Sequence, residues 1–417
     1  MGFHVDSEAG RLRRVILHRP DLELKRLTPS NKDALLFDDV LWVRRARAEH
    51  DGFADVLRER GVEVHFFQDL LAESMSVPEA RALVLDRVFD EKEYGPLATD
   101  HLRAAFDAMP AAELTSWLVG GMTKREFLAR HAEPVSVRFH VMERDDFLIN
   151  PLPNHLFTRD TSAWIYDGVC INAMRWPARW HETVHYEAVY RHHPLFAPGG
   201  FHVWSEGQAA YPSTIEGGDV LVIGEGAVLI GMSERTTPQA VEMLARGLFA
   251  AGSARTIVAL DMPKRRAFMH LDTVMTMVDG DTFTQYAGLG MLRSYTIEPG
   301  GRGAGAQGHR PSAGAHAPRH RRRAGPRLPA GAHRTPGRAR GRARAVGRRL
   351  QRPGDRTGRG RRLRAQRHDQ HVPAQARHRG HHHPGQRTGP GPGRPALYEL
   401  PGGAGGRAVT DPDPTAY

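Results

Sequence analysis

Apolar side chains near the amino terminus follow two periods, one typical of a strand and one typical of a helix. Residues 14–17 form a short apolar run, and residues 62–66 alternate apolar and polar side chains as a half-buried strand does. Between them, residues 41–60 place apolar side chains, Phe53 and Val56 among them, on one face of a helix. The pattern predicts a strand–helix–strand unit.

The next stretch, residues 70–134, keeps the helical period but has no strand pattern. Helix starts are indicated at residues 76–79, 99–100 and 123–126, where a capping residue comes before an acidic residue of the first turn. We interpret this stretch as a helical insertion in an otherwise mixed fold.

From residue 150 onward a repeat appears, in which an acidic residue precedes two apolar runs joined by a tight turn. Asp160, Asp219 and Asp272 open the three copies, and Asp-Gly turns of this kind are strong hairpin signals. In the middle copy a helix starting at Thr237 and a strand at residues 256–260 follow the hairpin. The repeat therefore predicts ββαβ modules in a propeller-like array, and we expect the acids to converge on one axis.

Composition divides the chain near residue 300. Residues 301–417 hold 26 Arg, no Lys and five acidic residues, a formal charge of +21, whereas residues 1–300 carry −10; together they give the +11 of the whole chain. The last 117 residues contain no Ile, Phe, Met or Trp, but they hold 22 of the 44 Gly and 14 of the 29 Pro. Such a segment buries too little apolar surface to offset the entropy of ordering it, so we expect residues 300–417 to form a disordered tail.

The rest of the composition excludes several classes of protein. The chain has one cysteine, Cys170, which rules out an intramolecular disulfide framework and a cysteine-rich metal site. No apolar run approaches the roughly 20 residues that span a bilayer, and the amino terminus is charged without an apolar signal core. We expect a cytoplasmic protein without a membrane partner.

The acidic clusters carry the candidate chemistry: Asp160, the pair Glu216 and Asp219, and His270 with Asp272. Residues two apart in a strand share a face, so His270 and Asp272 are expected to point the same way. A histidine beside carboxylates serves as a general acid or base near neutral pH, and converging carboxylates suit a guanidinium cation. Each cluster also has a structural alternative, as a loop end, a turn before a hairpin or a core histidine, and the recurrence favours the functional interpretation.

Eight short stretches of the first 299 residues occur in a fixed order: residues 15–20, 35–39, 49–51, 151–154, 157–160, 216–219, 234–236 and 269–272. In this combination the chain resembles the bacterial arginine deiminases of the guanidine-modifying pentein superfamily. The resemblance implies an α/β-propeller of ββαβ modules that is incomplete at its carboxyl end. Its parts would be a first module in residues 1–69, a helical insertion in residues 70–134 and further modules in residues 135–299.

The resemblance also implies roles for individual residues in converting L-arginine and water to L-citrulline and ammonia. Asp160 and Asp272 would hold the guanidinium, Glu216 would assist, and His270 would be the general acid and base. The implied substrate-binding residues are Asn154, Phe157, Arg179, Arg235, Asp38 and Asp219. Arg179 and Arg235 would clamp the α-carboxylate, which favours an amino acid over agmatine; no metal or organic cofactor is implied, and the protein could be a homo-oligomer.

The nucleophile of this chemistry is missing. In the resembling family a cysteine thiolate near the carboxyl end attacks the guanidinium carbon and forms a covalent amidino intermediate, and a reactive thiolate needs a base and positive charge nearby. No cysteine follows Cys170, which lies in an apolar run and is interpreted as a buried inert thiol. We therefore expect the polypeptide to be inactive as written.

The codons that can encode the tail suggest why the nucleophilic cysteine is missing. Residues 396–401 can be written GCG CTG TAT GAG CTG CCC, and reading one nucleotide later gives Arg-Cys-Met-Ser-Cys, which matches the family's nucleophile motif. Our hypothesis is a frameshift near codon 300, either real or a sequencing error.

Three alternatives stay open. The chain could be a non-catalytic arginine-binding remnant, or a sister amidinotransferase or dimethylarginine hydrolase. The third and least favoured is a nucleic-acid binder acting through basic runs such as residues 321–323. The tail lacks the interleaved aromatic side chains of single-strand binders, so we expect non-specific binding at most and no selected nucleic-acid partner.

Overall fold

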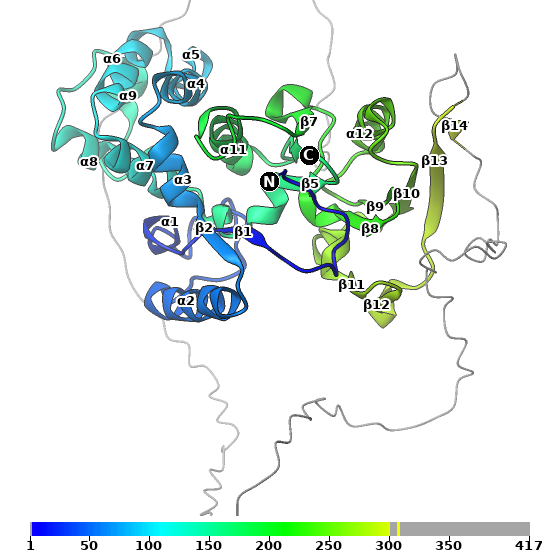
Figure 1. Ribbon diagram of the computed structural model, residues 1–417. Helices are drawn as coiled ribbons and strands as arrows, with labels where there is room; N and C mark the ends of the chain where they lie inside the picture. Colours follow the sequence, from blue (N-terminus) through cyan, green and yellow to red (C-terminus); the bar gives the residue numbers. More distant parts are fainter. Residues whose placement is uncertain (1, 301–306, 309–417) are drawn as a thin grey trace, which may run out of the picture. The chain divides into compact units, whose positions relative to one another are not determined.

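The amino-terminal unit matches its predicted order of elements. The computed structural model describes residues 2–300 and 307–308, which form mixed α/β structure (Figure 1). Strand β1 (Arg14–Leu17) pairs in parallel with β2 (Glu63–Phe66), and α2 (Val43–Glu59) connects them after the short α1 (Leu22–Lys25).

Helix α2 does not bury the face that its apolar residues suggested. Phe53 is 53% exposed and Val56 49% exposed, whereas Val43 and Ala54 are buried. Helix α2 contacts β2, and Val43 in its first turn packs with Leu24 and Phe37. The helix is thus buried along a narrow strip that leaves Phe53 and Val56 half exposed.

Residues 67–141 are helical with one short pair of strands. The helices are α3 (Phe67–Ser74), α4 (Pro78–Val88), α5 (Glu91–Tyr94), α6 (Pro96–Asp107), α7 (Ala111–Gly120), α8 (Lys124–Leu128) and α9 (Val137–Val141). Strands β3 (Met122–Thr123) and β4 (Phe147–Ile149) pair antiparallel. The helical character predicted for residues 70–134 is confirmed, and the boundaries of a separate domain stay a prediction.

Two of the three predicted helix starts are confirmed in position, although the first has no side-chain cap, and the remaining one is wrong. Helix α4 begins at Pro78, and Thr123 caps α8 in a full capping box with Glu126. Thr99 instead lies inside α6, which begins three residues earlier at Pro96. Its hydroxyl donates to the carbonyl of Gly95 at 2.9 Å, the bond to residue i−4 that threonine side chains form inside helices.

Two complete ββαβ modules follow, as the repeat predicted. The first contains β5 (Ser162–Ile165), β6 (Gly168–Ile171), α11 (Trp180–His192) and β7 (His202–Glu206), and the second contains β8 (Val220–Gly224), β9 (Ala227–Met232), α12 (Pro238–Ala251) and β10 (Thr256–Asp261). In each, the first two strands pair antiparallel and the strand after the helix pairs in parallel with the second. The two sheets and their helices lie in the green part of Figure 1.

The third copy is a hairpin without a module helix in the described residues. Strands β11 (Met275–Asp279) and β12 (Thr282–Gln285) pair only with each other. The next strand, β13 (Arg293–Glu298), returns to the second module and pairs antiparallel with β10, and β14 (Gln307–Gly308) pairs with β13. The described residues therefore contain two full modules, and a closed propeller stays a prediction.

A short helical turn precedes the first strand of each copy. These turns are α10 (Thr158–Thr161) before β5, the 3-10 turn η4 (Gly217–Asp219) before β8, and the 3-10 turn η6 (Leu271–Thr273) before β11. Further 3-10 turns are η1 (Pro153–Leu156), η2 (Pro177–Arg179), η3 (Gly207–Ala210), η5 (Arg266–Phe268) and η7 (Ala287–Leu289). Turn η4 packs against both α10 and η6, so the starts of the three copies meet as expected.

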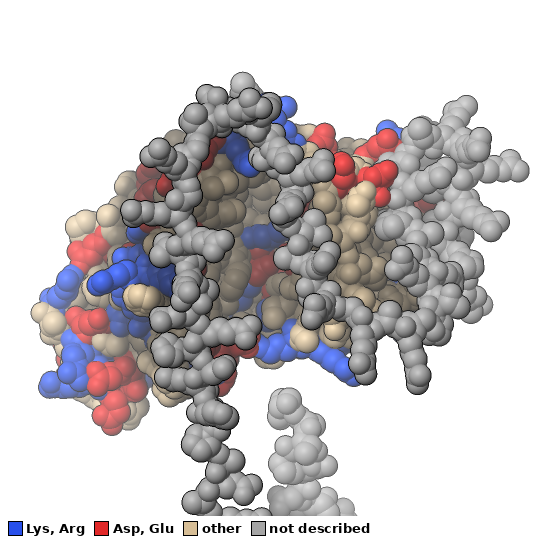
Figure 2. Space-filling model, turned by 90° about the horizontal axis from the view of Figure 1, so that it is seen from below, with Lys and Arg blue, Asp and Glu red and all other residues tan. Residues whose placement is uncertain are grey.

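Charge on the described part of the surface is mixed. On the face shown in Figure 2, basic and acidic side chains are interspersed. Over the described ranges, no helix is long and apolar enough to cross a membrane. The predictions for the tail, which are disorder, non-specific nucleic-acid binding and an altered reading frame, concern residues outside the described part of the chain, apart from β14.

Candidate functional site

Three buried side chains from the three turns form the centre of the candidate site. Nε2 of His270 lies 2.8 Å from a carboxylate oxygen of Glu216, and its Nδ1 lies 3.6 Å from a carboxylate oxygen of Asp160. All three residues are at most 7% exposed. The structure thus brings together the acid–histidine cluster that the repeat predicted.

The two glycines of the Glu-Gly-Gly-Asp motif permit this close approach. A Cβ added at Gly217 would overlap the carbonyl oxygen of Arg159, and one added at Gly218 would lie 2.8 Å from the ring of His270. Both neighbours belong to the adjoining turns, so a side chain at either glycine would push the turns apart. The motif is therefore needed for packing as well as for its acids.

Electrostatics in this cluster favour an ion pair. Burial alone would lower the pKa of His270, but the charges of Asp160 and Glu216 and the hydrogen bond to Glu216 outweigh it and raise the pKa to about 9. Burial would likewise raise the pKa of Glu216, but the hydrogen bond from His270 and the charges of Arg179 and Arg235 hold it below its usual value. At neutral pH the imidazole is therefore protonated and has a proton to donate.

Arg179 lies in the interior beside this cluster. Its Nη1 donates to Asp160 at 2.8 Å and lies 3.7 Å from Glu216, its Nε donates to Glu182 at 3.0 Å, and its Nη2 donates to the carbonyl oxygen of Asn154 at 3.2 Å. The side chain is 2% exposed. The guanidinium thus faces carboxylates of the protein, whereas the resemblance implied that it faces a ligand carboxylate.

The second predicted clamp residue, Arg235, is also buried. Its Nη1 donates to Glu216 at 3.1 Å, and its Nε has no hydrogen-bond partner among the described residues. Arg235 therefore keeps a buried donor at Nε to which no described residue offers an acceptor at hydrogen-bond distance.

Asp219 occupies a structural hydrogen-bond network. Its carboxylate accepts from the hydroxyl groups of Ser233 and Thr236 at 2.5 and 2.6 Å and from the backbone N–H of Leu271 at 2.9 Å. Burial raises its pKa to about 7. These contacts tie η4 to the end of β9 and to η6, so the geometry favours a positioning role over the substrate contact that the resemblance implied.

Asp272 is half-buried on η6. Burial raises the pKa of its carboxyl group, and the nearby charges of His270 and Arg159 oppose the rise. The strand argument that joined Asp272 to His270 is wrong, because residues 271–273 form a 3-10 turn in which alternation does not apply.

The remaining predicted residues lie at the edge of the cluster. The amide of Asn154 donates to the carbonyl oxygen of Leu35 at 2.8 Å, which fastens the 31–38 segment to η1. The ring of Phe157 is 47% exposed and lies 6.0 Å from that of Phe37. Asp38 is exposed and pairs with Arg266 of η5 at 2.8 Å, so the structure does not bring it to the buried cluster.

Sequence reasoning missed Glu182. This residue is fully buried on α11 and holds both Nε and Nη2 of Arg179, while its other oxygen has no hydrogen-bond partner in the described structure. Burial raises its pKa to about 7 against the opposing charge of Arg179. The three-residue spacing of Arg179 and Glu182 was the available signal, because residues i and i+3 adjoin on a helix.

A resident metal does not fit the cluster. Within the described ranges, Asp160, Glu216 and His270 form the one group of three potential metal ligands, with all ligand atoms within 4.8 Å of one another. The guanidinium groups of Arg179 and Arg235, however, already neutralise both carboxylates at hydrogen-bond distance. A divalent cation would have to replace or repel these fixed positive charges.

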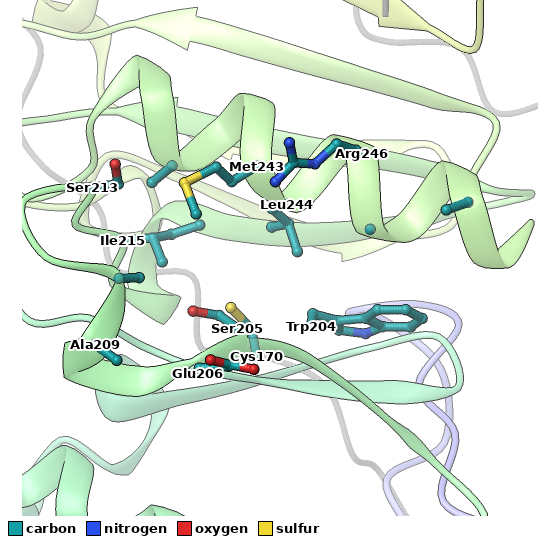
Figure 3. A pocket seen from close by; sticks show the side chains of 14 residues that line it. Cys170, Trp204, Ser205, Glu206, Ala209, Ser213, Ile215, Met243, Leu244 and Arg246 are labelled. Atoms are coloured by element: carbon teal, nitrogen blue, oxygen red, sulfur yellow. The ribbon is translucent and has the colours of Figure 1, made fainter. Parts of the chain in front are cut away.

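Cys170 lies outside the cluster of Asp160, Glu216 and His270. It is buried on β6, where burial raises its pKa to about 12, and it lines a cavity of about 560 Å³ between the first module and α12. Figure 3 shows Met243 and Leu244 of the helix on one wall and Trp204 and Ser205 of β7 on the other. None of the predicted site residues lines this cavity. The interpretation of Cys170 as an inert buried thiol agrees with its protonated state.

The arrangement can bind a planar cation and move a proton. Asp160 and Glu216 offer carboxylate oxygens in a buried setting, where a guanidinium is held through paired hydrogen bonds. His270 can give a proton to a leaving group and take one from water. The single thiol of the chain is not among these groups.

Comparison with known proteins gives one family and several solved structures. A family model described as arginine deiminase matches residues 33–308. An apo arginine dihydrolase, ArgZ, from Cyanobacteria is 23% identical over 33% of this chain and 20% of its own, with a TM-score of 0.27. The DDAH from Pseudomonas aeruginosa, a cysteine-to-serine mutant complexed with citrulline, is 14% identical over 67% of this chain and 72% of its own, with a TM-score of 0.36. The amidinotransferase SxtG from Microseira wollei is 14% identical over 67% and 68%, with a TM-score of 0.35. The chain thus spans a fifth of the length of the dihydrolase.

Proposed function

Because this chain belongs to the arginine deiminase family, we propose that its buried acid–histidine cluster is a site for the guanidinium of L-arginine. The observation that carries the proposal is the imidazole of His270 lying between the carboxylates of Asp160 and Glu216, whose charges raise its pKa. In this family setting the reaction would be hydrolysis of L-arginine to L-citrulline and ammonia, without a metal or organic cofactor.

Each group has a role in the proposed chemistry. With a thiolate supplied at the cluster, the thiolate would add to the guanidinium carbon, His270 would give its proton to the departing amino group, and ammonia would leave. The neutral imidazole would then take a proton from water and the hydroxide would add to the amidino carbon. The carbon–sulfur bond would break to release the thiolate and O-protonated citrulline, which loses that proton to solvent. Asp160, Asp272 and Glu216 would hold the positive charge throughout.

We propose that this polypeptide binds arginine and does not turn it over. The only cysteine, Cys170, lines a separate cavity and is protonated at neutral pH. The reading-frame hypothesis supplies the reason, and the nucleotide sequence around codon 300 tests it. The hypothesis fails if no frame there restores an open reading frame that encodes Gly-Pro-Arg-Cys.

Calorimetric titration of the full chain with L-arginine tests the proposed binding. We expect one binding site, and we expect Asp160→Asn to weaken binding by about tenfold or more, because it removes one carboxylate of a charged pair. Agmatine, which lacks the α-carboxylate, is the matched ligand control and should bind more weakly. Absence of heat with arginine for a folded chain would contradict the proposal, and so would equal binding by the Asp160→Asn variant.

A further inference from the structure

The carboxylates proposed to bind a substrate guanidinium already hold one from the protein. Arg179 donates to Asp160 at 2.8 Å and lies 3.7 Å from Glu216 through the same nitrogen, Nη1. These two carboxylates are also the partners of His270. The chemical group at this position is the one that the substrate would present.

All three nitrogens of Arg179 donate to acceptors of the protein. Besides Asp160, Glu182 accepts from Nε and lies 2.9 Å from Nη2, and the carbonyl oxygen of Asn154 accepts from Nη2. Burial alone would lower the pKa of Arg179, but the charges of Glu182, Asp160 and Glu216 raise it above its usual value. The guanidinium is thus charged and tightly held, and each of its three nitrogens already faces an acceptor of the protein.

We propose that the guanidinium of Arg179 is an internal occupant of this carboxylate site, so that a guanidinium ligand binds only in exchange with it. The inference rests on the proposed function and adds a means of regulating the same site. Exchange replaces one guanidinium by another, so the buried carboxylates never lose their positive partner, which is the costly event for a buried ion pair.

The segment that carries Arg179 lies at the surface. Arg179 ends η2, and the preceding residues Arg175 and Trp176 are exposed, so this segment borders solvent. The site therefore has a closed form, filled by Arg179, and an open form that accepts a ligand. Only the open fraction binds, which lowers the apparent affinity of the native chain.

Titration with methylguanidinium separates this role from a carboxylate clamp, because this ligand has no carboxylate. We expect Arg179→Met, which removes the charge and keeps the length, to bind methylguanidinium about tenfold or more tightly than the native full chain does. A clamp would leave methylguanidinium affinity unchanged and weaken L-arginine alone. Unchanged or weaker methylguanidinium binding by this variant overturns the inference.

Arg235→Met is the matched control, because Arg235 is equally buried and contacts Glu216 without contacting Asp160. We expect a much smaller gain from this variant. An equal gain in both variants would mean that the loss of positive charge, and not a vacated position, raises the affinity, and it would overturn the inference.

A second substitution keeps the test decisive if Arg179→Met does not fold. Glu182→Gln retains Arg179 but removes the charge that holds two of its nitrogens, so methylguanidinium affinity should rise by about threefold. An unchanged affinity in this variant counts against the inference. L-arginine binding by the native chain separates the two claims: if it binds and neither variant gains affinity, the proposed function stands and the inference falls. If no form binds either ligand, both fall.

Discussion

The second ββαβ module and the third hairpin share one sequence pattern but differ in burial. Strands β8 and β9 are almost entirely buried, and α12 packs against their sheet. Strands β11 and β12 are mostly exposed, and they pair only with each other. An acid, two apolar runs and a tight turn are therefore enough for a hairpin. Without a covering helix in the described residues, the third hairpin buries little more than Met277, which packs with Leu221 and Leu229 of the second module.

This difference matters for the site because its parts come from both regions. Glu216 precedes the buried hairpin, and His270 precedes the exposed one. The position of His270 therefore depends on the packing of η6 against η4 and on the hydrogen bond that the backbone N–H of Leu271 donates to Asp219.

Truncation of a buried strand residue should have the largest effect. Ile230 on β9 is fully buried, and we expect Ile230→Ala to lower the free energy of unfolding by about 4 kcal/mol, because it leaves a cavity. Val278 on β11 is 58% exposed, and Val278→Ala should change the free energy of unfolding by less than about 0.5 kcal/mol. Chemical denaturation of both variants checks the contrast, and equal losses would refute it.

Glycine substitutions should give a somewhat smaller difference in stability loss between the two regions. Gly217→Ala places a Cβ against the backbone of Arg159, which cannot move aside like a side chain, so we expect a loss of about 3 kcal/mol. Gly280, in the turn of the third hairpin, has open space where a Cβ would lie, and Gly280→Ala should be within about 0.5 kcal/mol of the native chain. Thermal unfolding distinguishes them, and a stable Gly217→Ala variant would show that the turns are less tightly packed than described.

The pH dependence of stability should report the ion pair between His270 and Glu216, which joins the two regions. The folded pKa of His270 is about 9, above its ordinary value of 6.5, so its stabilising contribution is complete below pH 6.5 and is lost as pH rises through 9. We expect the free energy of unfolding of the native chain to exceed that of the His270→Gln variant by about 2 kcal/mol at pH 6. This difference should shrink towards pH 9.5. Denaturant titrations at the two pH values measure this, and a difference that grows with pH would contradict the assigned proton.

The smallest effect should come from the exposed pair beside the third hairpin. Asp38 and Arg266 form an ion pair at the surface, with side chains 84% and 45% exposed. Asp38→Asn should change stability by less than about 0.5 kcal/mol and leave L-arginine binding unaltered. A large loss of binding in calorimetry would instead assign Asp38 to the site, as the family resemblance implied.

The sequence was informative where neighbouring residues determine structure. The hairpins and α12 were predictable, since Thr237 caps the helix and Pro238 occupies its first position. Helix α11 was missed because residues 182–190 are buried on all sides and so show no amphipathic stripe. The exposed Phe53 and Val56 of α2 show the reverse case, a stripe that no neighbour covers in the described residues.

The candidate site was predictable for a different reason. Asp160, Glu216 and His270 all lie shortly before the first strand of a copy of the repeat, so their convergence follows from the topology. The orientation of the Arg179 side chain was less predictable, because it is set by hydrogen bonds to Glu182 and Asp160, which the fold brings next to it. The family resemblance implied that Arg179 clamps a ligand carboxylate, whereas in the structure its guanidinium donates to Glu182 and Asp160.

The most direct test of the proposed function uses L-arginine labelled with carbon-13 at its guanidino carbon, mixed with the full chain and followed by NMR. We expect the guanidino resonance to shift or broaden as the ligand binds, and we expect no citrulline carbonyl signal to grow. An unperturbed resonance with folded protein would contradict the binding site, and a growing citrulline signal would contradict the loss of the nucleophile.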